Sequence, residues 1–308
     1  MSGTYGISAT AKINLYLRVC GTLPNGYHRL NTLMHEISLS DEVQVTVDDD
    51  REHEIVAVCR GGKPIPNNKN LCYKAAVRFF SALKKSKGVK KLPYVEITID
   101  KIIPSEAGIG GGSSDAAAVI LSLAEHYGNP FTIEELNEIA AHTGADTPFF
   151  LYGGACVCEG FGEEITSIEP LTGLSLLLIK PKDGVSTPWC FSKYDDDVDG
   201  RPTFDEKSYE LFKKALYEAD KPLEVIKNNK ELLVNDLSKY AEEKLPQIKE
   251  AREKLDQLGA EFASMSGSGS CVFGIFEDEA KRDLAYDKIS SDSDFMKKGF
   301  TLFKCETL

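Results

Sequence analysis

Apolar and polar residues alternate near the start of the chain. The apolar positions of this stretch recur at every second residue: Ile13, Leu15, Leu17 and Val19. The positions between them carry polar groups: Lys12, Asn14, Tyr16 and Arg18. A period of two is typical of a half-buried strand, because successive side chains point to opposite faces. Residues 12–20 are therefore predicted to form a strand with Lys12 and Asn14 together on its polar face.

Other stretches of the chain have strand patterns as well. Alternation predicts strands at 42–47 and 94–100. The nearly continuous apolar run at 174–180 predicts a strand that is buried on both faces.

Apolar spacings of three and four residues predict helices between these strands. One helix is expected within residues 67–85, beginning near Asn70. A second is expected after residue 112, with an apolar stripe at Ala116, Val119, Ile120, Leu123 and Tyr127. Ser113 or Ser114 should cap its start, and Gly128 should end it.

A third helix is predicted by a capping signal. Thr132 and Glu135 have the spacing of a capping box. Helical patterns also occur at 210–219 and 248–259, after an acidic, loop-like segment at 193–206.

Length and the change of pattern predict two domains. A chain of 308 residues usually forms about two domains. The boundary is placed near Pro170, giving domains at 1–170 and 171–308.

The chain is acidic, with a formal net charge of −12. This charge argues against nucleic-acid binding, which relies on a broad basic surface. An anionic ligand would have to be held by local geometry, since salt screens charges beyond about 8 Å. The aspartates at 195–197 are interpreted as a solvated loop.

The cysteines and the N-terminal residues indicate the compartment. The eight cysteines lack the spacing of a zinc site or of a disulfide framework. No apolar run reaches the roughly 18 residues of a membrane span, and no leader pattern precedes residue 7. We expect reduced thiols, a cytoplasmic protein and no membrane partner.

Four glycines lie close together in residues 104–118, which read PSEAGIGGGSSDAAA. A tight strand-to-helix turn would need only one or two glycines. A dinucleotide-binding GxGxxG pattern would need glycine in place of Ser113. A phosphate cradle, in which backbone N–H groups turn inward beside the positive end of a helix, uses all of them. The cradle is the favoured interpretation, and the chain holds no Walker A sequence.

A second glycine cluster, MSGSGSCVFGIF, occupies residues 265–276 and precedes a predicted strand. Alone, an SGSG sequence usually forms a flexible turn. Two such clusters far apart in the chain favour a shared phosphate pocket.

These stretches resemble motifs of a known family. PSEAGIGGGSSDAAA is similar to the central phosphate-binding motif of the GHMP small-molecule kinases, and SMSGSGSCVF is similar to their third motif. Within these kinases, a narrower resemblance is to the family that acts on 4-diphosphocytidyl-2-C-methyl-D-erythritol. It is carried by AKINLYL, NGYHRLNTL, TGADTPFFLYGG and EGFGEEIT. The resemblance runs from residue 7 to about residue 276.

The resemblance implies a fold and a reaction. The fold is α+β in two domains, an N-terminal domain like the second domain of ribosomal protein S5 and a C-terminal ferredoxin-like domain. ATP with Mg²⁺ is the implied donor, and the 2-hydroxyl of the diphosphocytidyl methylerythritol is the implied acceptor. The implied ATP-binding residues are Pro104, Ala107, Gly108, Ile109, Gly110, Gly111, Gly112, Ser113, Ser114, Gly267, Ser268 and Gly269. The metal ligands stay open, and a monomer or homodimer is expected.

The same resemblance implies that Lys12 and Asp146 are the catalytic pair. Phosphoryl transfer depends mainly on positioning and charge stabilisation. Asp146 can orient the acceptor hydroxyl and take its proton, while Lys12 can keep Asp146 ionised and stabilise the moving phosphoryl charge. Without the resemblance, a solvated lysine on a strand edge and an aspartate in a loop turn would be the simpler interpretations.

Five further residues are implied to bind the substrate. Tyr27 and Phe191 would sandwich the cytosine, and His28 would bond its polar edge. Thr187 would touch the diphosphate, and Asn14 would assist at the acceptor end.

The sequence departs from the family pattern at Glu106, and two alternative functions stay open. Glu106 places an extra carboxylate beside the glycines, where it either faces solvent or helps to hold magnesium. The first alternative is a GHMP kinase for another small alcohol, such as homoserine or mevalonate. The second is a noncatalytic nucleotide-binding module.

Overall fold

The computed structural model describes residues 2–22, 26–61, 65–198, 205–218 and 222–308. The chain forms two compact units that interleave along the sequence. The first unit consists of Met1–Ala11, Leu39–Ile103 and Gly110–Gly153, and the second of Lys12–Ser38, Pro104–Ile109 and Gly154–Leu308.

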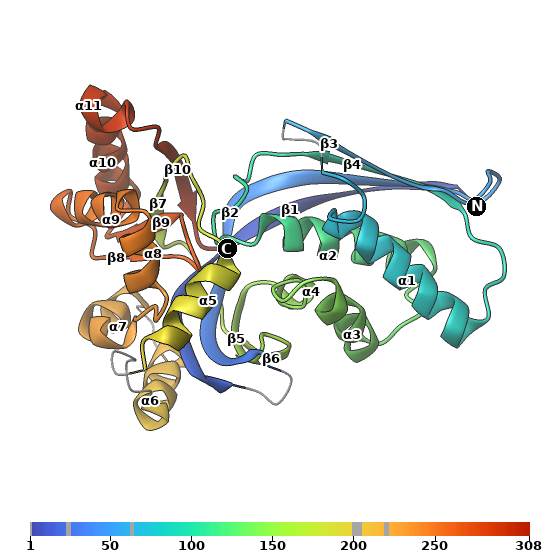
Figure 1. Cartoon of the computed structure of the whole chain (residues 1–308), viewed down its shortest axis with the longest axis horizontal. Coiled ribbons are helices and arrows are strands. Elements are labelled where there is room, and N and C mark those ends of the chain that lie inside the picture. The colour runs from blue at the N-terminus through green and yellow to red at the C-terminus, as the bar shows by residue number, and fades with distance from the viewer. Residues whose placement is uncertain (1, 23–25, 62–64, 199–204, 219–221) are drawn as a thin grey trace. The chain divides into compact units, whose positions relative to one another are not determined.

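The interleaving arises from two long strands, drawn in blue in Figure 1. Strands β1 (Gly3–Thr22) and β2 (His28–Asp48) each contribute residues to both units. The compact units therefore do not follow one cut along the chain. The domain boundary near Pro170 stays a prediction.

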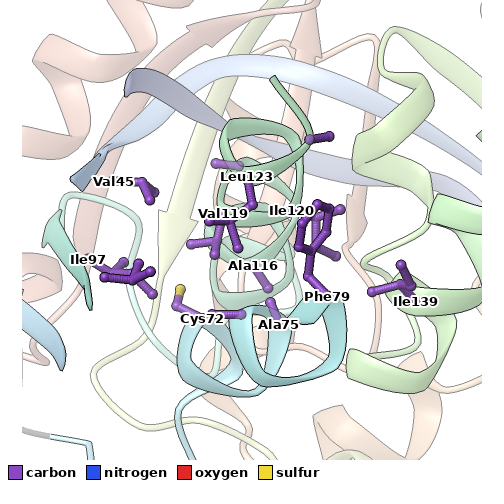
Figure 2. Packing of buried hydrophobic residues seen from close by; sticks show 14 of the residues in the cluster. Val45, Cys72, Ala75, Phe79, Ile97, Ala116, Val119, Ile120, Leu123 and Ile139 are labelled. Carbon is purple, nitrogen blue, oxygen red and sulfur yellow. The ribbon is translucent and has the colours of Figure 1, made fainter. Parts of the chain in front are cut away.

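The first unit packs helices against one face of a sheet (Figure 1). In this unit β3 (Ile55–Arg60) runs parallel to β4 (Tyr94–Asp100), which pairs antiparallel with residues 42–48 of β2. The helices are α1 (Leu71–Lys87), α2 (Gly111–His126), α3 (Ile133–Thr143) and α4 (Phe149–Tyr152). Val45 and Ile97 from the sheet meet Ala75 and Phe79 of α1 and Ile120 of α2 in the core (Figure 2).

Capping signals placed two of these helices correctly. The Asn70 side chain accepts a hydrogen bond from the Cys72 N–H at 2.9 Å, so α1 begins where predicted. Thr132 and Glu135 form the predicted capping box of α3. Such caps satisfy N–H groups that a helix start leaves without a helical partner.

The predicted cap of α2 was wrong. Gly110 caps this helix without a side chain, so Ser113 and Ser114 lie inside its first turn. Gly110 has a φ of 78°, and its carbonyl accepts the N–H groups of both serines at 2.9 Å. A left-handed glycine ends the loop earlier than a serine cap would. Gly128 lies just beyond the helix end, as predicted.

The second unit contains an antiparallel sheet in the order β10-β7-β9-β8. Its strands are β7 (Ser175–Lys180), β8 (Phe262–Met265), β9 (Val272–Phe276) and β10 (Thr301–Glu306). Every residue of β7 is buried, which confirms the prediction for 174–180. Strands β5 (Ala155–Gly160) and β6 (Glu164–Ile168) continue from β2 in the same unit.

Helices α9 (Gln247–Gln257) and α10 (Glu279–Ser291) pack against the β10-β7-β9-β8 sheet. The remaining helices of this unit are α5 (Thr187–Asp196), α6 (Glu206–Tyr217), α7 (Pro222–Asn228), η1 (Lys230–Leu232), α8 (Ser238–Lys244) and α11 (Ser293–Met296). The helices predicted from 210–219 and 248–259 are thus present. Within the described part of the chain, no helix combines the length and apolar character of a membrane span.

The acidic segment at 193–206 differs from the predicted loop. Helix α5 extends through Asp196, and residues 199–204 lie outside the described residues. Asp195 bonds His28, and Asp197 accepts a hydrogen bond from Lys239 at 2.6 Å. The interpretation of 195–197 as a loop was wrong for Asp195 and Asp196, which belong to α5, whereas their exposure to solvent is as predicted.

Candidate active site

The polar face of β1 is buried in the second unit. Lys12 is 2% exposed and Asn14 is 1% exposed, while Tyr16 and Arg18 are also buried. The strand is therefore covered on both faces rather than half-buried, as its alternating pattern had suggested. A buried lysine also rules out the simpler interpretation of Lys12 as a solvated side chain.

Lys12 is held at the start of the second unit by two oxygen atoms. Its Nζ donates hydrogen bonds to Asn14 Oδ1 at 2.5 Å and to the Gly108 carbonyl at 2.9 Å. Its backbone N–H donates to the Ile109 carbonyl at 3.0 Å. The Asn14 amide in turn donates to Thr32 Oγ1 at 2.8 Å. These bonds orient the ammonium group, since a buried polar group needs partners to offset its lost hydration.

The two glycine clusters meet in the second unit. The Ser266 hydroxyl donates to the Gly108 carbonyl at 3.0 Å, so Lys12 and Ser266 converge on one oxygen atom. A Cβ at Gly108 would lie 2.1 Å from the Ser266 carbonyl oxygen, and φ at Gly108 is 74°. A Cβ at Gly267 would lie 2.8 Å from the Gly108 oxygen. Only glycine fits this close approach of two backbones.

A second contact joins the two glycine clusters on the other side of Gly108. The Cys271 N–H donates to the Ala107 carbonyl at 3.0 Å, and Ala107 and Ile109 are buried. Pro104 is half-buried at the start of the loop. Glu106 is exposed and has a φ of 52°.

Two residues that the sequence analysis did not select support the third motif. Ser266 belongs to the SMSGSGSCVF stretch, but its bond to Gly108 had no signal in the sequence. Asn235 donates from its amide to the carbonyls of Met265 at 2.9 Å and Gly267 at 2.8 Å. Its Oδ1 accepts from the Leu237 N–H at 3.0 Å. The Asn235 amide therefore fixes the backbone on both sides of Ser266.

Helix α5 connects the third motif with predicted substrate residues. Thr187, at its start, shares a hydrogen bond with Ser268 at 2.6 Å between the two hydroxyl oxygens. The Cys190 thiol donates to the Ser268 carbonyl at 3.7 Å. Thr187 and Ser268, assigned to substrate and ATP respectively, thus lie side by side.

The ring contacts near His28 differ from the expected sandwich. His28 stacks on Phe191 with ring centroids 4.5 Å apart and planes at 19°. Tyr27 is 63% exposed, and its ring lies 5.7 Å from that of Phe161. The sandwich of Tyr27 and Phe191 around a base stays a prediction.

In the first unit, the other predicted glycines begin α2. A Cβ at Gly111 would lie 2.7 Å from Ile103 Cγ2, so packing requires glycine there. At Gly112 the nearest atom would be Leu71 Cδ1 at 3.7 Å, which is an ordinary contact. Packing therefore does not explain why residue 112 is glycine.

Asp146 lies in a turn of the same unit. The Thr147 N–H closes this turn on the Gly144 carbonyl at 3.1 Å. A Cβ at Gly144 would lie 3.4 Å from Ser113 Oγ, so the turn is close to the first turn of α2. The first unit thus brings the aspartate's turn and Ser113 together. The pairing of Asp146 with Lys12 of the other unit stays a prediction.

An ionic cluster under α2 was not anticipated. Lys101 Nζ donates to Asp115 Oδ2 at 2.8 Å and also to Asp41 Oδ2. Asp41 Oδ1 accepts from the Ile103 N–H at 2.8 Å. Burial, together with repulsion from Asp41, raises the pKa of Asp115 to about 7, although Lys101 opposes this shift. The cluster ties the end of β4 to the first turns of α2.

Comparison with known families defines the class of the fold. The model for the GHMP kinases N terminal domain matches residues 70–154, and the model for the GHMP kinases C terminal matches residues 203–293. The predicted two-domain α+β GHMP kinase fold is confirmed by these matches.

Individual relatives show which family of GHMP kinases the chain resembles. A 4-diphosphocytidyl-2-C-methyl-D-erythritol kinase of Acetivibrio thermocellus is 38% identical over 288 residues, covering 92% of this chain and 94% of the relative. The kinase of the same name from Clostridium tetani is 35% identical over 294 residues, covering 92% and 95%. A crystal structure of 4-(cytidine 5'-diphospho)-2C-methyl-D-erythritol kinase has a TM-score of 0.71 at 28% identity, covering 98% of this chain and 99% of that one. The chain belongs to the 4-diphosphocytidyl-2-C-methyl-D-erythritol kinase family of the GHMP kinases.

Proposed function

We propose that this protein transfers the γ-phosphoryl group of ATP to the 2-hydroxyl of 4-diphosphocytidyl-2-C-methyl-D-erythritol, in the non-mevalonate route to isoprenoid precursors. The observation that carries the proposal is the convergence of three family motifs on one atom. Lys12 of the first motif and Ser266 of the third both donate to the carbonyl of Gly108 in the second.

In the proposed mechanism, Lys12 and Asp146 act on the reacting groups. The buried Lys12 ammonium stabilises the charge that spreads over the transferring phosphoryl oxygens. Asp146 orients the acceptor hydroxyl and accepts its proton as the new O–P bond forms. Such a base contributes about 10² to 10⁴-fold to the rate.

The glycine loop serves as the phosphate cradle in this proposal. Gly108 and Gly110 have positive φ angles, which turn successive backbone groups in different directions. The start of α2 adds a partial positive charge. Gly112 supports this role, because packing leaves room for a side chain there, whereas a close phosphate would not.

Mg²⁺ is proposed as the partner of ATP. Among the described residues, no group of three His, Cys, Asp or Glu side chains could hold a metal by itself. Mg²⁺ usually binds one or two protein oxygens together with nucleotide phosphates and water. Ser113 and Ser114, in the first turn of α2, would offer hydroxyl oxygens to the ion. When bound, the ion would neutralise phosphate charge.

Residues of the second unit are proposed to bind the cytidine diphosphate. Tyr27, His28 and Phe191 contact the cytosine, Thr187 contacts the diphosphate, and Asn14 assists near the acceptor. The bond between Thr187 and Ser268 supports this arrangement, because it brings together two residues that we propose to contact the substrate and ATP, respectively. A cytoplasmic location fits the proposed substrates.

The test is a kinase assay with the purified full chain. ATP, MgCl2 and the cytidine substrate should release ADP and form a product phosphorylated at the 2-hydroxyl, detected by ³¹P NMR. Homoserine and mevalonate serve as alternative acceptors. ADP release with either of these alone would support the other GHMP activity. ATP binding by calorimetry without transfer to any acceptor would indicate a noncatalytic module.

A further inference from the structure

His28 has a hydrogen-bond partner that the family motifs do not include. Its Nε2 lies 2.8 Å from Oδ1 of Asp195, in the last turn of α5. The same helix provides Phe191, on which the imidazole stacks, and Tyr194, whose ring meets the imidazole edge at 89°. One helix therefore sets both the plane of the His28 ring and the direction of its Nε2.

The type of partner decides which ring nitrogen carries the hydrogen. An ionised carboxylate only accepts hydrogen bonds, so Nε2 must be the donor in this pair. In the neutral imidazole, Nδ1 then has a lone pair and acts as an acceptor. A carboxylate behind a histidine is a common way to select its tautomer and orientation.

We propose that Asp195 is a positioning residue that determines specificity for cytosine by presenting Nδ1 of His28 as a hydrogen-bond acceptor. The inference rests on the proposed function, in which His28 bonds the base. Cytosine carries an exocyclic amino group that can donate to Nδ1. Uracil carries a carbonyl oxygen at the same position, so two lone pairs would face each other and the hydrogen bond would be lost.

A simple surface ion pair would have a different effect. The Asp195 side chain is 49% exposed and that of His28 is 13% exposed, so their pairing adds little to stability. Asp196 provides a matched control, because it is also in the last turn of α5 and pairs with Lys193 at 2.7 Å on the surface. Asp196→Asn removes one negative charge, as Asp195→Asn does, but at the residue next to the one that contacts the imidazole.

The first experiment measures kcat/KM for the cytidine substrate and for its uridine counterpart. Asp195→Ala should lower the cytidine value about tenfold, since one directed hydrogen bond is lost, and should leave the uridine value unchanged or raise it, since the released ring can turn a donor toward the uracil carbonyl. Asp195→Asn should lower it similarly, because an amide can offer either its oxygen or its NH2 to Nε2 and no longer selects one tautomer. Asp196→Asn should keep the wild-type ratio. A cytidine-to-uridine ratio that Asp195→Asn leaves unchanged would overturn the proposal.

The second experiment observes the tautomer directly, without turnover. Two-bond ¹H–¹⁵N correlations at about pH 8, where histidine is normally neutral, should show hydrogen on Nε2 of His28 in the wild type. They should show a mixture of tautomers in Asp195→Asn. His28→Gln assigns the signal among the five histidines. Hydrogen on Nδ1 of the wild-type ring, in either a neutral or a doubly protonated form, would contradict the proposal.

The two experiments separate this inference from the proposed function. If the wild type phosphorylates the cytidine substrate but the Asp195 variants keep its base preference, only the role of Asp195 fails. If the folded wild type does not phosphorylate the cytidine substrate at all, the proposed function fails and the inference fails with it.

Discussion

Gly108 and Gly112 belong to the same glycine-rich stretch, yet the structure explains them differently. At Gly108, a positive φ and a backbone carbonyl 2.1 Å from the position of a Cβ make glycine obligatory for folding. At Gly112, a methyl group would meet only Leu71 at an ordinary distance. Glycine at 108 is therefore explained by folding, whereas glycine at 112 is explained only by the proposed approach of a phosphate.

Among the residues proposed to act on bound ligands, Asp146 is expected to give the largest loss of activity when it is changed. Asp146→Asn removes the proposed base and should lower kcat by about 10² to 10⁴-fold. The melting temperature should change little, because the residue lies in a partly exposed turn. Steady-state kinetics and thermal unfolding provide the two measurements. Asp100→Asn, a change of the same type at a half-exposed carboxylate on β4, is the control. Nearly full activity of Asp146→Asn would exclude this residue as the base.

Gly108→Ala should have the largest effect on folding. The added methyl group would collide with the Ser266 carbonyl, in a conformation that disfavours any side chain. We expect the free energy of unfolding to fall by about 3 kcal/mol or more in urea titrations, with loss of activity. Gly6→Ala is a control, since a methyl group there has no neighbour within 4 Å. If the Gly108→Ala variant were as stable as the wild type, glycine at 108 would not be required for folding.

Gly112→Ala should affect nucleotide binding without harming the fold. Alanine is the better helix former, so the free energy of unfolding should stay constant or rise by up to about 1 kcal/mol. The KM for ATP should rise about tenfold, because the methyl group obstructs the approach of a phosphate to the backbone. Gly111→Ala should instead lose stability, since its methyl group would press on Ile103. An unchanged KM for ATP in Gly112→Ala would count against the cradle.

The smallest expected effect is on the pH dependence of stability and concerns Asp115, the buried carboxylate under α2. The folded-state pKa of Asp115 is raised by burial to about 7, from an ordinary value of 3.8. Its contribution to stability is fully present below the ordinary value and is lost as the pH rises through about 7. The free energy of unfolding should therefore fall between about pH 5 and about pH 8, by roughly 2 kcal/mol from this group. Asp115→Asn should flatten that part of the profile, and an unaltered slope in chemical denaturation would contradict the assignment.

Local signals in the sequence predicted several elements correctly for a physical reason. Asn70 and the Thr132–Glu135 pair satisfy N–H groups within a few residues of themselves, so their role needs no distant partner. The same holds for the buried run at 174–180. Ser113 was wrongly predicted as the cap of α2. Gly110 caps the helix instead through a left-handed backbone conformation, which glycine allows but which its presence in a sequence does not predict.

The motifs likewise placed the chain in its family, because they are stretches of residues that can be compared without a structure. What they could not provide is the set of bonds between them. Ser266 and Gly108 are 158 positions apart, and His28 and Asp195 are 167 apart. Neither residue of such a pair carries a local pattern that identifies the other.

The sequence by itself thus determined strands at 12–20, 42–47, 94–100 and 174–180, the starts of α1 and α3, the family and the candidate residues, because periodicity, caps and motifs are local properties. Only the tertiary structure decided that Lys12 is buried, that Ser266 and Lys12 share the Gly108 carbonyl, and that α5 holds His28. The physical reason is that burial and hydrogen-bond partners depend on which distant segments pack together. A strand with alternating polar residues has the same sequence pattern whether water or protein covers its polar face.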